Sequence, residues 1–129
     1  PLQAVMTLQA PIISIQTIKA GESVGYHQRW TATHNSTIAV IAIGYGDGYP
    51  RHASNGTPVK IGKQTAHLVG HVSMDTISVD ISHCPSLRIG DSATLWGEEL
   101  AVNLIAEHAN TISYDLLTGI TPRVKKHYI

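Results

Sequence analysis

The sequence predicts a mostly β protein, folded as a compact β-barrel or sandwich-like domain with one or two short helices. Short segments in which apolar and polar residues alternate recur along the 129-residue chain, and a period of two is the pattern of half-buried strands. Gly and Pro separate these segments at short intervals, as expected for hairpins and tight turns. A helical pattern occurs only between Asn103 and Leu117, so we expect the helices there.

The first predicted strands lie in the N-terminal half. Pro11–Lys19 alternates apolar and polar residues, and Ala20-Gly21 directly after it predicts a turn. Thr37–Ile43 is apolar and rich in β-branched residues, which is typical of a strand covered on both faces. Ser54–Thr57 contains Asn-Gly, a dipeptide that accepts the positive φ of tight turns, and so predicts a hairpin.

The middle of the chain continues the β pattern. Val59–Val72 predicts a hairpin that reverses near Gly62-Lys63-Gln64, and Thr76–Ile81 alternates again. Leu87–Asp91 predicts a turn that leads into a short strand at Ala93–Trp96.

The C-terminal part contains the helical pattern. Asn103 is a suitable N-cap for a helix over Leu104–Ala109, and a short helical turn is expected at Tyr114–Leu117. Arg123–Ile129 is basic and β-branched enough for a last strand. The chain should therefore contain seven to nine short strands.

Composition excludes several functional classes. Nine Lys and Arg balance nine Asp and Glu, so the chain has no basic field for nucleic acid or anionic lipid. The longest apolar run, Ile38–Ile43, is too short to span a bilayer. Cys84 is the single cysteine and cannot form an internal disulfide, which fits the cytoplasm.

The eight histidines do not predict a metal site. They are scattered along the chain and no cysteine supports them. His67 and His71 are four residues apart, but their surroundings predict a strand, where that spacing separates side chains by about 13 Å. No metal ligand is therefore assigned.

Three segments are more polar and richer in glycine than a β core requires: Gly21–Trp30, Gly44–Arg51 and Val69–Asp75. Each places an ionisable or hydrogen-bonding side chain beside Gly, just after a predicted strand. Glycine allows the backbone to approach a ligand or to take up a tight turn. Taken one at a time, each segment is explained equally well by a hairpin turn.

Taken in order, these segments resemble the alanine racemases, and the resemblance covers almost the whole chain. The matching segments are Val5–Leu8, Lys19–Tyr26, Ile43–Arg51, Val69–Asp75, Gly90-Asp91, Leu95–Gly97, Thr111–Tyr114 and Arg123-Val124. The resemblance implies that residues 1–129 are the C-terminal β-domain of a two-domain subunit. An N-terminal α/β-barrel would then carry pyridoxal 5'-phosphate (PLP) on a lysine. The abrupt start at Pro1, without Met, agrees with a piece of a longer protein.

The resemblance also implies an activity and partners. The complete enzyme would interconvert L-alanine and D-alanine, the latter for bacterial cell-wall peptidoglycan, and would act as a cytoplasmic homodimer. This domain would pack against the N-terminal barrel and reach the active site of the partner subunit. The isolated chain is expected to be inactive, because the cofactor's lysine would lie in the absent domain.

The resemblance gives individual residues their expected roles. Tyr26 matches the tyrosine that serves as one of two catalytic bases, with the barrel lysine as the other. Met74 matches the residue whose backbone N–H binds the substrate carboxylate, and Tyr114 matches the tyrosine that donates to the PLP phosphate. Tyr45 and Arg51 match residues that line the entry to the site. Without the resemblance, the three tyrosines, Met74 and Arg51 would be assigned to turns, core packing and solvated surface.

The sequence departs from the commonest family pattern at three positions. His27 follows the catalytic tyrosine where Gly is usual, His71 occupies a position often held by Arg, and Asp115 replaces Glu. Three alternatives stay open: a sister racemase for serine or another amino acid, a PLP decarboxylase of similar architecture, and a non-catalytic β-module for dimerisation. Cys84 lies outside any cysteine-containing catalytic segment, which disfavours the decarboxylase.

Overall fold

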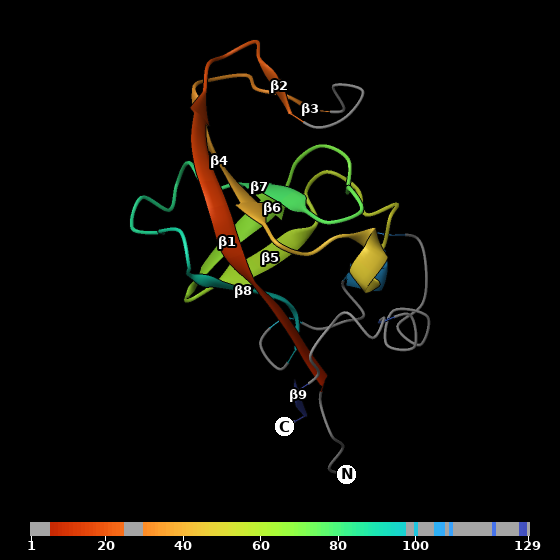
Figure 1. Ribbon diagram of the computed structural model, residues 1–129. Coiled ribbons are helices and arrows are strands. Elements are labelled where there is room, and N and C mark those ends of the chain that lie inside the picture. The colour runs from red at the N-terminus through yellow and green to blue at the C-terminus, as the bar shows by residue number, and fades with distance from the viewer. Residues whose placement is uncertain are drawn as a thin grey trace.

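The strand pairs of the chain are antiparallel, and most strands lie around one centre, with a separate two-stranded sheet above it and a last short strand below it (Figure 1). The computed structural model describes residues 6–24, 30–97, 100, 105–107, 109, 120 and 127–128. In chain order the strands are β1 (Met6–Ile18), β2 (Ser23–Val24), β3 (Trp30–Thr31), β4 (Ser36–Ile41), β5 (Pro58–Ile61), β6 (Gln64–Leu68), β7 (Ile77–Asp80), β8 (Ser92–Trp96) and β9 (His127–Tyr128). The predicted mostly β fold is confirmed.

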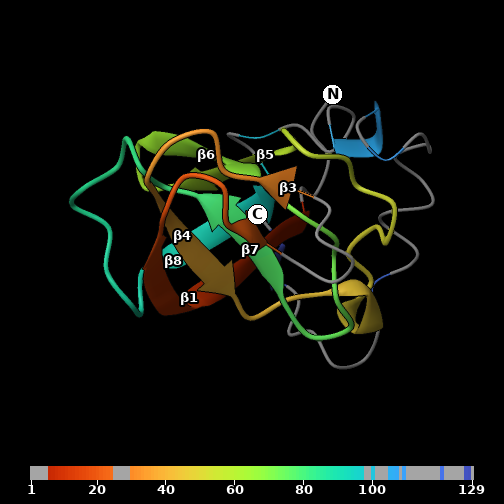
Figure 2. The ribbon, with the colours of Figure 1, turned by 90° about the horizontal axis from the view of Figure 1, so that it is seen from above.

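Six strands close into a barrel. Its order is β4-β7-β6-β5-β8-β1, and β1 pairs back onto β4, so the sheet has no free edge between them. Figure 2 shows these strands arranged around a common interior, with the helical turn after β4 to one side. Closure removes the unpaired backbone groups that an open sheet would present.

Strand β1 closes the barrel because it is long enough to pair with two neighbours. Its residues Leu8–Pro11 lie opposite β8, and Ile12–Ile18 lie opposite β4. The register shifts once in each pairing, between Leu8 and Gln9 and between Ile12 and Ser14. The strand therefore begins five residues before the predicted start at Pro11.

Apolar side chains fill the interior from every barrel strand. The most completely buried aliphatic residues include Leu8, Ile12, Ala39, Ile41, Val59, Ile61, Leu68, Val79 and Leu95, each at most 1% exposed. Each large aliphatic side chain buried in this way contributes about 1.5–3 kcal/mol to folding. All six residues of β4 are buried or half-buried, which confirms that this strand is covered on both faces.

Two predicted turns have different outcomes. The β5–β6 hairpin is confirmed, with Ile61 opposite Gln64 and a left-handed Gly62 at φ 63° in the reversal. The hairpin predicted at Ser54–Thr57 is wrong. These residues do form a turn, in which the Thr57 N–H and hydroxyl both donate to the Ser54 carbonyl at 3.1 and 2.7 Å. However, the residues before this turn are irregular, so the turn leads into β5 without joining it to another strand.

The expected short helix is represented by residues 105–107, where the Ala109 N–H donates to the Ile105 carbonyl at 3.1 Å. The predicted N-cap Asn103 and the turn Tyr114–Leu117 lie outside the described residues. A second helical turn, η2 (Tyr45–Asp47), follows β4 and was not predicted from the sequence.

Strand pairing brings three connecting segments to one end of the barrel. Ile41, the last residue of β4, lies opposite Ile77, the first residue of β7, so the segments after β4 and before β7 are neighbours. Pro58, at the start of β5, lies opposite His67 near the end of β6. The turn before β5 therefore lies beside the segment that leaves β6.

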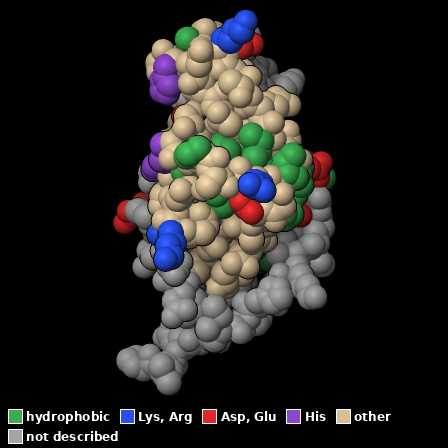
Figure 3. Space-filling model, turned by 90° about the vertical axis from the view of Figure 1, so that its left-hand side faces the viewer, with side chains coloured by type: hydrophobic (Ala, Val, Ile, Leu, Met, Phe, Trp, Pro, Cys, Tyr) green, Lys and Arg blue, Asp and Glu red, His purple; other side chains and the backbone are tan. Residues whose placement is uncertain are grey.

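The opposite side of the barrel carries the connection between β7 and β8. Its main chain is fixed to β1, because the Gly90 N–H donates to the Ile12 carbonyl at 2.8 Å and the Ile12 N–H donates to Asp91 O at 2.9 Å. Figure 3 views this side and shows hydrophobic side chains gathered at mid-height. Ile13 and Ile89 are among the exposed large hydrophobic residues, at 48% and 65%.

Two features are absent from the described part of the chain. Within it, no helix is both long enough and apolar enough to cross a membrane. The same residues contain no group of three His, Cys, Asp or Glu side chains placed to hold a metal ion.

Candidate functional site

The turn after β4 and the turn before β7 pack main chain against main chain at one end of the barrel. The Tyr45 N–H donates to the Ser73 carbonyl at 3.0 Å, and the Gly46 N–H donates to the Met74 carbonyl at 2.9 Å. A Cβ on Gly44 would lie 2.2 Å from the Ser73 carbonyl oxygen. Gly44 has an extended φ of −150°, so this position needs glycine for the close approach and not for an unusual backbone angle.

The first turn, around η2, is held by its own backbone and one buried carboxylate. Asp47 is 6% exposed and accepts a hydrogen bond from the Gly44 N–H at 3.0 Å. The Tyr49 N–H also donates to the Gly44 carbonyl, at 3.3 Å, and Gly48 ends the turn with a left-handed φ of 104°. Asp47 therefore has a structural role here.

Tyr49 fixes this turn to the barrel core. Its ring stacks on that of Trp96, with ring centroids 6.2 Å apart and planes 13° from parallel, and both residues are at most 1% exposed. Burial raises the pKa of the Tyr49 hydroxyl far above its usual range. Neither the Tyr49 hydroxyl nor the Trp96 indole N–H has a hydrogen-bond partner among the described residues.

The second turn, Ser73–Thr76, presents Met74 to solvent. The Ser73 N–H donates to the Thr76 carbonyl at 3.0 Å, and the Thr76 N–H donates to the Ser73 hydroxyl oxygen at 3.0 Å. Met74, in the second position of this turn, is 52% exposed. Its carbonyl accepts the hydrogen bond from the Gly46 N–H, but its own N–H has no acceptor among the described residues. A main-chain donor without an acceptor, on a residue that lines a cavity, is available to a ligand anion.

A cavity of about 640 Å³ opens between the three segments. Tyr45 and Arg51 line it from the η2 side, His52 and Asn55 from the turn before β5, and His71 and Met74 from the segment between β6 and β7. The Arg51 guanidinium carbon lies 4.9 Å from the centre of the Tyr45 ring, within the range of a cation–π contact. This contact positions the Arg51 charge at the cavity wall.

The side chains around the cavity suit an anionic ligand. One arginine and two histidines line it, while none of its described lining residues is Asp or Glu. None of the described lysines (Lys19, Lys60 and Lys63) lines it either. The described wall therefore suits a carboxylate and lacks the amine that PLP would need for a covalent attachment.

The structure brings together three of the five predicted site residues. Tyr45, Arg51 and Met74 line the same cavity, although they come from segments separated by more than twenty residues. Tyr26 and Tyr114 lie outside the described residues.

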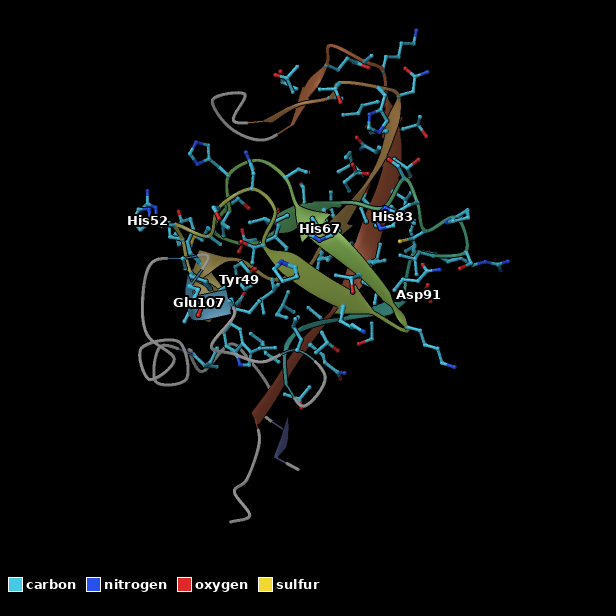
Figure 4. The ribbon with its side chains drawn as sticks, turned by 180° about the vertical axis from the view of Figure 1, so that it is seen from behind. Tyr49, His52, His67, His83, Asp91 and Glu107 are labelled. Carbon is cyan, nitrogen blue, oxygen red and sulfur yellow. The ribbon has the colours of Figure 1, made fainter. Side chains whose placement is uncertain are left out.

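Sequence reasoning did not assign three residues that also line the cavity: His52, Asn55 and His71. Figure 4 shows His52 at one edge of the molecule, with His83 and Asp91 at the opposite edge. The Asn55-Gly56 dipeptide was noticed as a turn signal, but its nearness to the Met74 segment depends on the pairing of β5 with β6. His71 was noticed as a departure from the family pattern and was rejected, together with His67, as a metal ligand.

Comparison with known proteins decides the family. The family described as "Alanine racemase, C-terminal domain" matches residues 5–128. The chain belongs to this family. The resemblance noted from the sequence is thereby confirmed, and the β-barrel is the fold of an alanine racemase C-terminal domain.

Individual relatives agree with this assignment. The alanine racemase of Vesicomyosocius okutanii is 54% identical over 124 residues, which are 95% of this chain and 35% of that protein. The alanine racemase of Marinobacter nauticus is 50% identical over 121 residues, 94% of this chain and 34% of that protein. The chain thus spans about a third of the length of these relatives.

Solved structures show the same fold. The biosynthetic alanine racemase from Pseudomonas aeruginosa superposes with a TM-score of 0.90 at 45% identity, covering 92% of this chain and 33% of that one. The alanine racemase from Bartonella henselae, solved with covalently bound pyridoxal phosphate, gives a TM-score of 0.86 at 35% identity, covering 91% and 33%.

Proposed function

We propose that this domain forms one wall of the substrate site of a PLP-dependent alanine racemase, which interconverts L-alanine and D-alanine. The observation that carries the proposal is the Met74 N–H, which has no acceptor among the described residues and belongs to an exposed residue beside a cavity lined by Arg51 and by no described acid. A main-chain donor near a guanidinium is suited to the α-carboxylate of an amino acid. Membership of the alanine racemase family supports alanine as the substrate.

Each residue assigned to the substrate site has a distinct task. Arg51, held against the Tyr45 ring, attracts the substrate carboxylate toward the cavity, and the Met74 N–H binds it. Tyr26 removes or returns the α-proton on one face of the substrate. A lysine of the N-terminal domain does the same on the other face. A free tyrosine has a pKa of about 10, so cationic groups from that domain must stabilise the phenolate.

The cofactor is held mainly outside this chain. PLP supplies an electron sink for the carbanion that forms when the α-proton leaves. We place its lysine in an N-terminal α/β-barrel, and we assign Tyr114 as a donor to its phosphate. Because the proposed cofactor lysine belongs to that barrel, residues 1–129 alone should neither retain PLP nor racemise alanine.

The complete enzyme would be a cytoplasmic homodimer that supplies D-alanine for peptidoglycan. In that arrangement Tyr26 and Met74 face the cofactor of the partner subunit, and Tyr114 faces the cofactor of its own. A racemase for serine is the second candidate, because an anion-binding wall recognises the carboxylate shared by all amino acids.

The experiment that tests this function is Tyr26→Phe in the full-length protein. The variant should keep PLP, measured by its visible absorbance, while racemisation falls by about 10²–10⁴-fold, the range for losing a general acid–base group. Chiral analysis of alanine and serine in both directions supplies the rates and the preferred substrate. Near-normal rates in the variant would show that Tyr26 is only an aromatic anchor.

A further inference from the structure

Asn55 links two walls of the cavity. Its side-chain oxygen Oδ1 accepts a hydrogen bond from the Gly70 N–H at 2.8 Å, and both residues line the cavity. Asn55 comes from the turn before β5, whereas Gly70 begins the segment that carries His71 and Met74. This bond therefore joins parts of the wall that are fifteen residues apart in the sequence.

The bond lies just beyond the end of the β5–β6 ladder. Pro58 lies opposite His67 at that end, and two main-chain bonds follow before the turn. The Leu68 N–H still donates to the Thr57 carbonyl, and the Gly56 N–H to the Leu68 carbonyl, both at 2.8 Å. At Asn55 the main chain has entered the turn, and the side-chain carbonyl takes over the role of a backbone acceptor.

Gly70 depends on this acceptor. The residue is buried and has a left-handed φ of 79°, so the chain leaves the course of β6 at this residue. A buried N–H that loses its partner costs more than an ordinary hydrogen bond contributes. Losing the Asn55 acceptor should therefore shift the chain at Gly70, where the course toward Met74 is set.

The Met74 segment is thus held at both ends. Backbone bonds from Tyr45 and Gly46 hold its far end, and Asn55 holds its near end. Between them, Val72 is 6% exposed and anchors the segment in the core. A donor fixed in this way binds a ligand without first losing conformational freedom.

We propose that Asn55 is a positioning residue of the substrate site: through Gly70 it sets the place and direction of the Met74 N–H. The inference rests on the proposed function, because the ligand it serves is the substrate carboxylate. The amide also suits the site chemically. An aspartate could accept the same hydrogen bond, but it would add a negative charge to a wall whose described lining residues carry none.

The test uses the full-length enzyme with Asn55→Ala and Asn55→Asp. In Asn55→Ala, amide hydrogen exchange of the peptide over residues 70–74 should become roughly tenfold faster. The KM for alanine should rise about tenfold, while kcat stays within about twofold and PLP stays bound, because neither the base nor the cofactor is touched. In Asn55→Asp, whose carboxylate can still accept from Gly70, exchange over residues 70–74 should return to the wild-type rate.

Asp91→Ala is the matched control. Asp91 also accepts a hydrogen bond from a backbone N–H, that of Arg88, at 2.8 Å, and it lies at the opposite edge of the molecule from His52 (Figure 4). The Asp91→Ala variant loses an exposed hydrogen bond and should leave both the KM for alanine and the exchange over residues 70–74 unchanged.

Two results would overturn the role of Asn55: unchanged exchange over residues 70–74 in Asn55→Ala, or an unchanged KM despite faster exchange. The exchange measurement needs no turnover. If the wild-type enzyme proves inactive on alanine, the proposed function fails, yet the exchange data still decide whether Asn55 holds the Met74 segment.

Discussion

Gly44 lies so close to the main chain of Met74 that a Cβ on Gly44 would be 2.6 Å from the Met74 carbonyl carbon. Non-bonded carbon atoms do not approach each other this closely, so the two turns fit together only because residue 44 has no side chain. The hydrogen bonds from Tyr45 and Gly46 cross the same interface. Tyr45, which lines the entry, and Met74, whose N–H is proposed to bind the substrate carboxylate, are therefore parts of one rigid unit.

Gly44→Ala should damage both stability and substrate binding in the full-length enzyme. The new methyl group must push the Ser73–Thr76 turn outward, which costs about 1–3 kcal/mol for overpacking a tight interface. The displaced Met74 N–H should then raise KM for alanine by roughly tenfold or more. Thermal unfolding and steady-state kinetics measure the two effects.

The control for this change is Gly62→Ala. Gly62 has a left-handed φ of 63° and open space around its Cβ position, so alanine there costs about 1 kcal/mol of backbone strain without touching the site. It should lower the melting temperature and leave KM unchanged. Equal kinetic effects of the two variants would mean that KM responds to general destabilisation.

The role of the Met74 N–H can be separated from that of its side chain. Met74→Ala keeps the N–H and should change KM by no more than about threefold, because the side chain is 52% exposed. Met74→Pro deletes the N–H at the second position of a four-residue turn, where proline is commonly accepted. Losing a hydrogen bond to a charged group should raise KM by about ten- to a hundredfold.

Circular dichroism and PLP absorbance check that the proline variant is folded. If Met74→Pro binds alanine as well as the wild type does, the carboxylate is held elsewhere. If Met74→Ala is as impaired as Met74→Pro, the side chain matters and the N–H does not.

Tyr49→Phe should stabilise the domain within the full-length protein. The buried Tyr49 hydroxyl has no partner among the described residues, so removing it relieves about 1 kcal/mol of desolvation cost. The stack on Trp96 is kept, because only the oxygen is lost. Chemical denaturation at neutral pH measures the gain, and a loss of stability instead would reveal a hydrogen bond to the hydroxyl.

The same variant should change the alkaline limit of stability. Burial raises the folded-state pKa of Tyr49 above its unfolded value near 10. The folded protein therefore keeps this proton while the unfolded chain releases it. Ionisation of Tyr49 therefore leaves the free energy of unfolding unchanged below about pH 10. As the pH rises further, this free energy falls by up to about 1.4 kcal/mol per pH unit. Tyr49→Phe should show a shallower loss over this range.

The sequence predicted the strands well where alternation is regular and less well where the barrel closes. β7 alternates buried and half-buried residues as expected. β1 also alternates from Leu8 to Ile13 and loses the period of two only where its pairing with β4 shifts, between Ile12 and Ser14. Its start was predicted five residues late although Met6–Ala10 alternates apolar and polar residues as well. At Ser54–Thr57 the turn was predicted from local preference, but local preference does not determine which strands a turn joins.

The candidate site was predicted only as far as the family resemblance extended. Tyr45, Arg51 and Met74 were assigned by their motifs and do line one cavity. Asn55 and Gly44 were not assigned, since each acts through a segment distant in the sequence. Contacts of this kind follow from the pairing of strands, which a single sequence does not display.

The last prediction concerns which subunit supplies which group in the proposed homodimer. One full-length variant lacks the N-terminal lysine, and the other carries Tyr26→Phe. Each homodimer should be nearly inactive, because every site lacks one base. If Tyr26 serves the partner's cofactor, a mixed dimer contains one site that lacks both bases and one site that is intact.

Co-expression with two different affinity tags allows this mixed dimer to be isolated. With independent sites it should recover roughly half of the wild-type activity per dimer. If the lysine and Tyr26 of one subunit instead served the same site, each site of the mixed dimer would still lack one base. Activity would then stay at the level of the single variants. That result would overturn the shared site while leaving the role of Tyr26 as a base intact, because the two homodimers test that role separately.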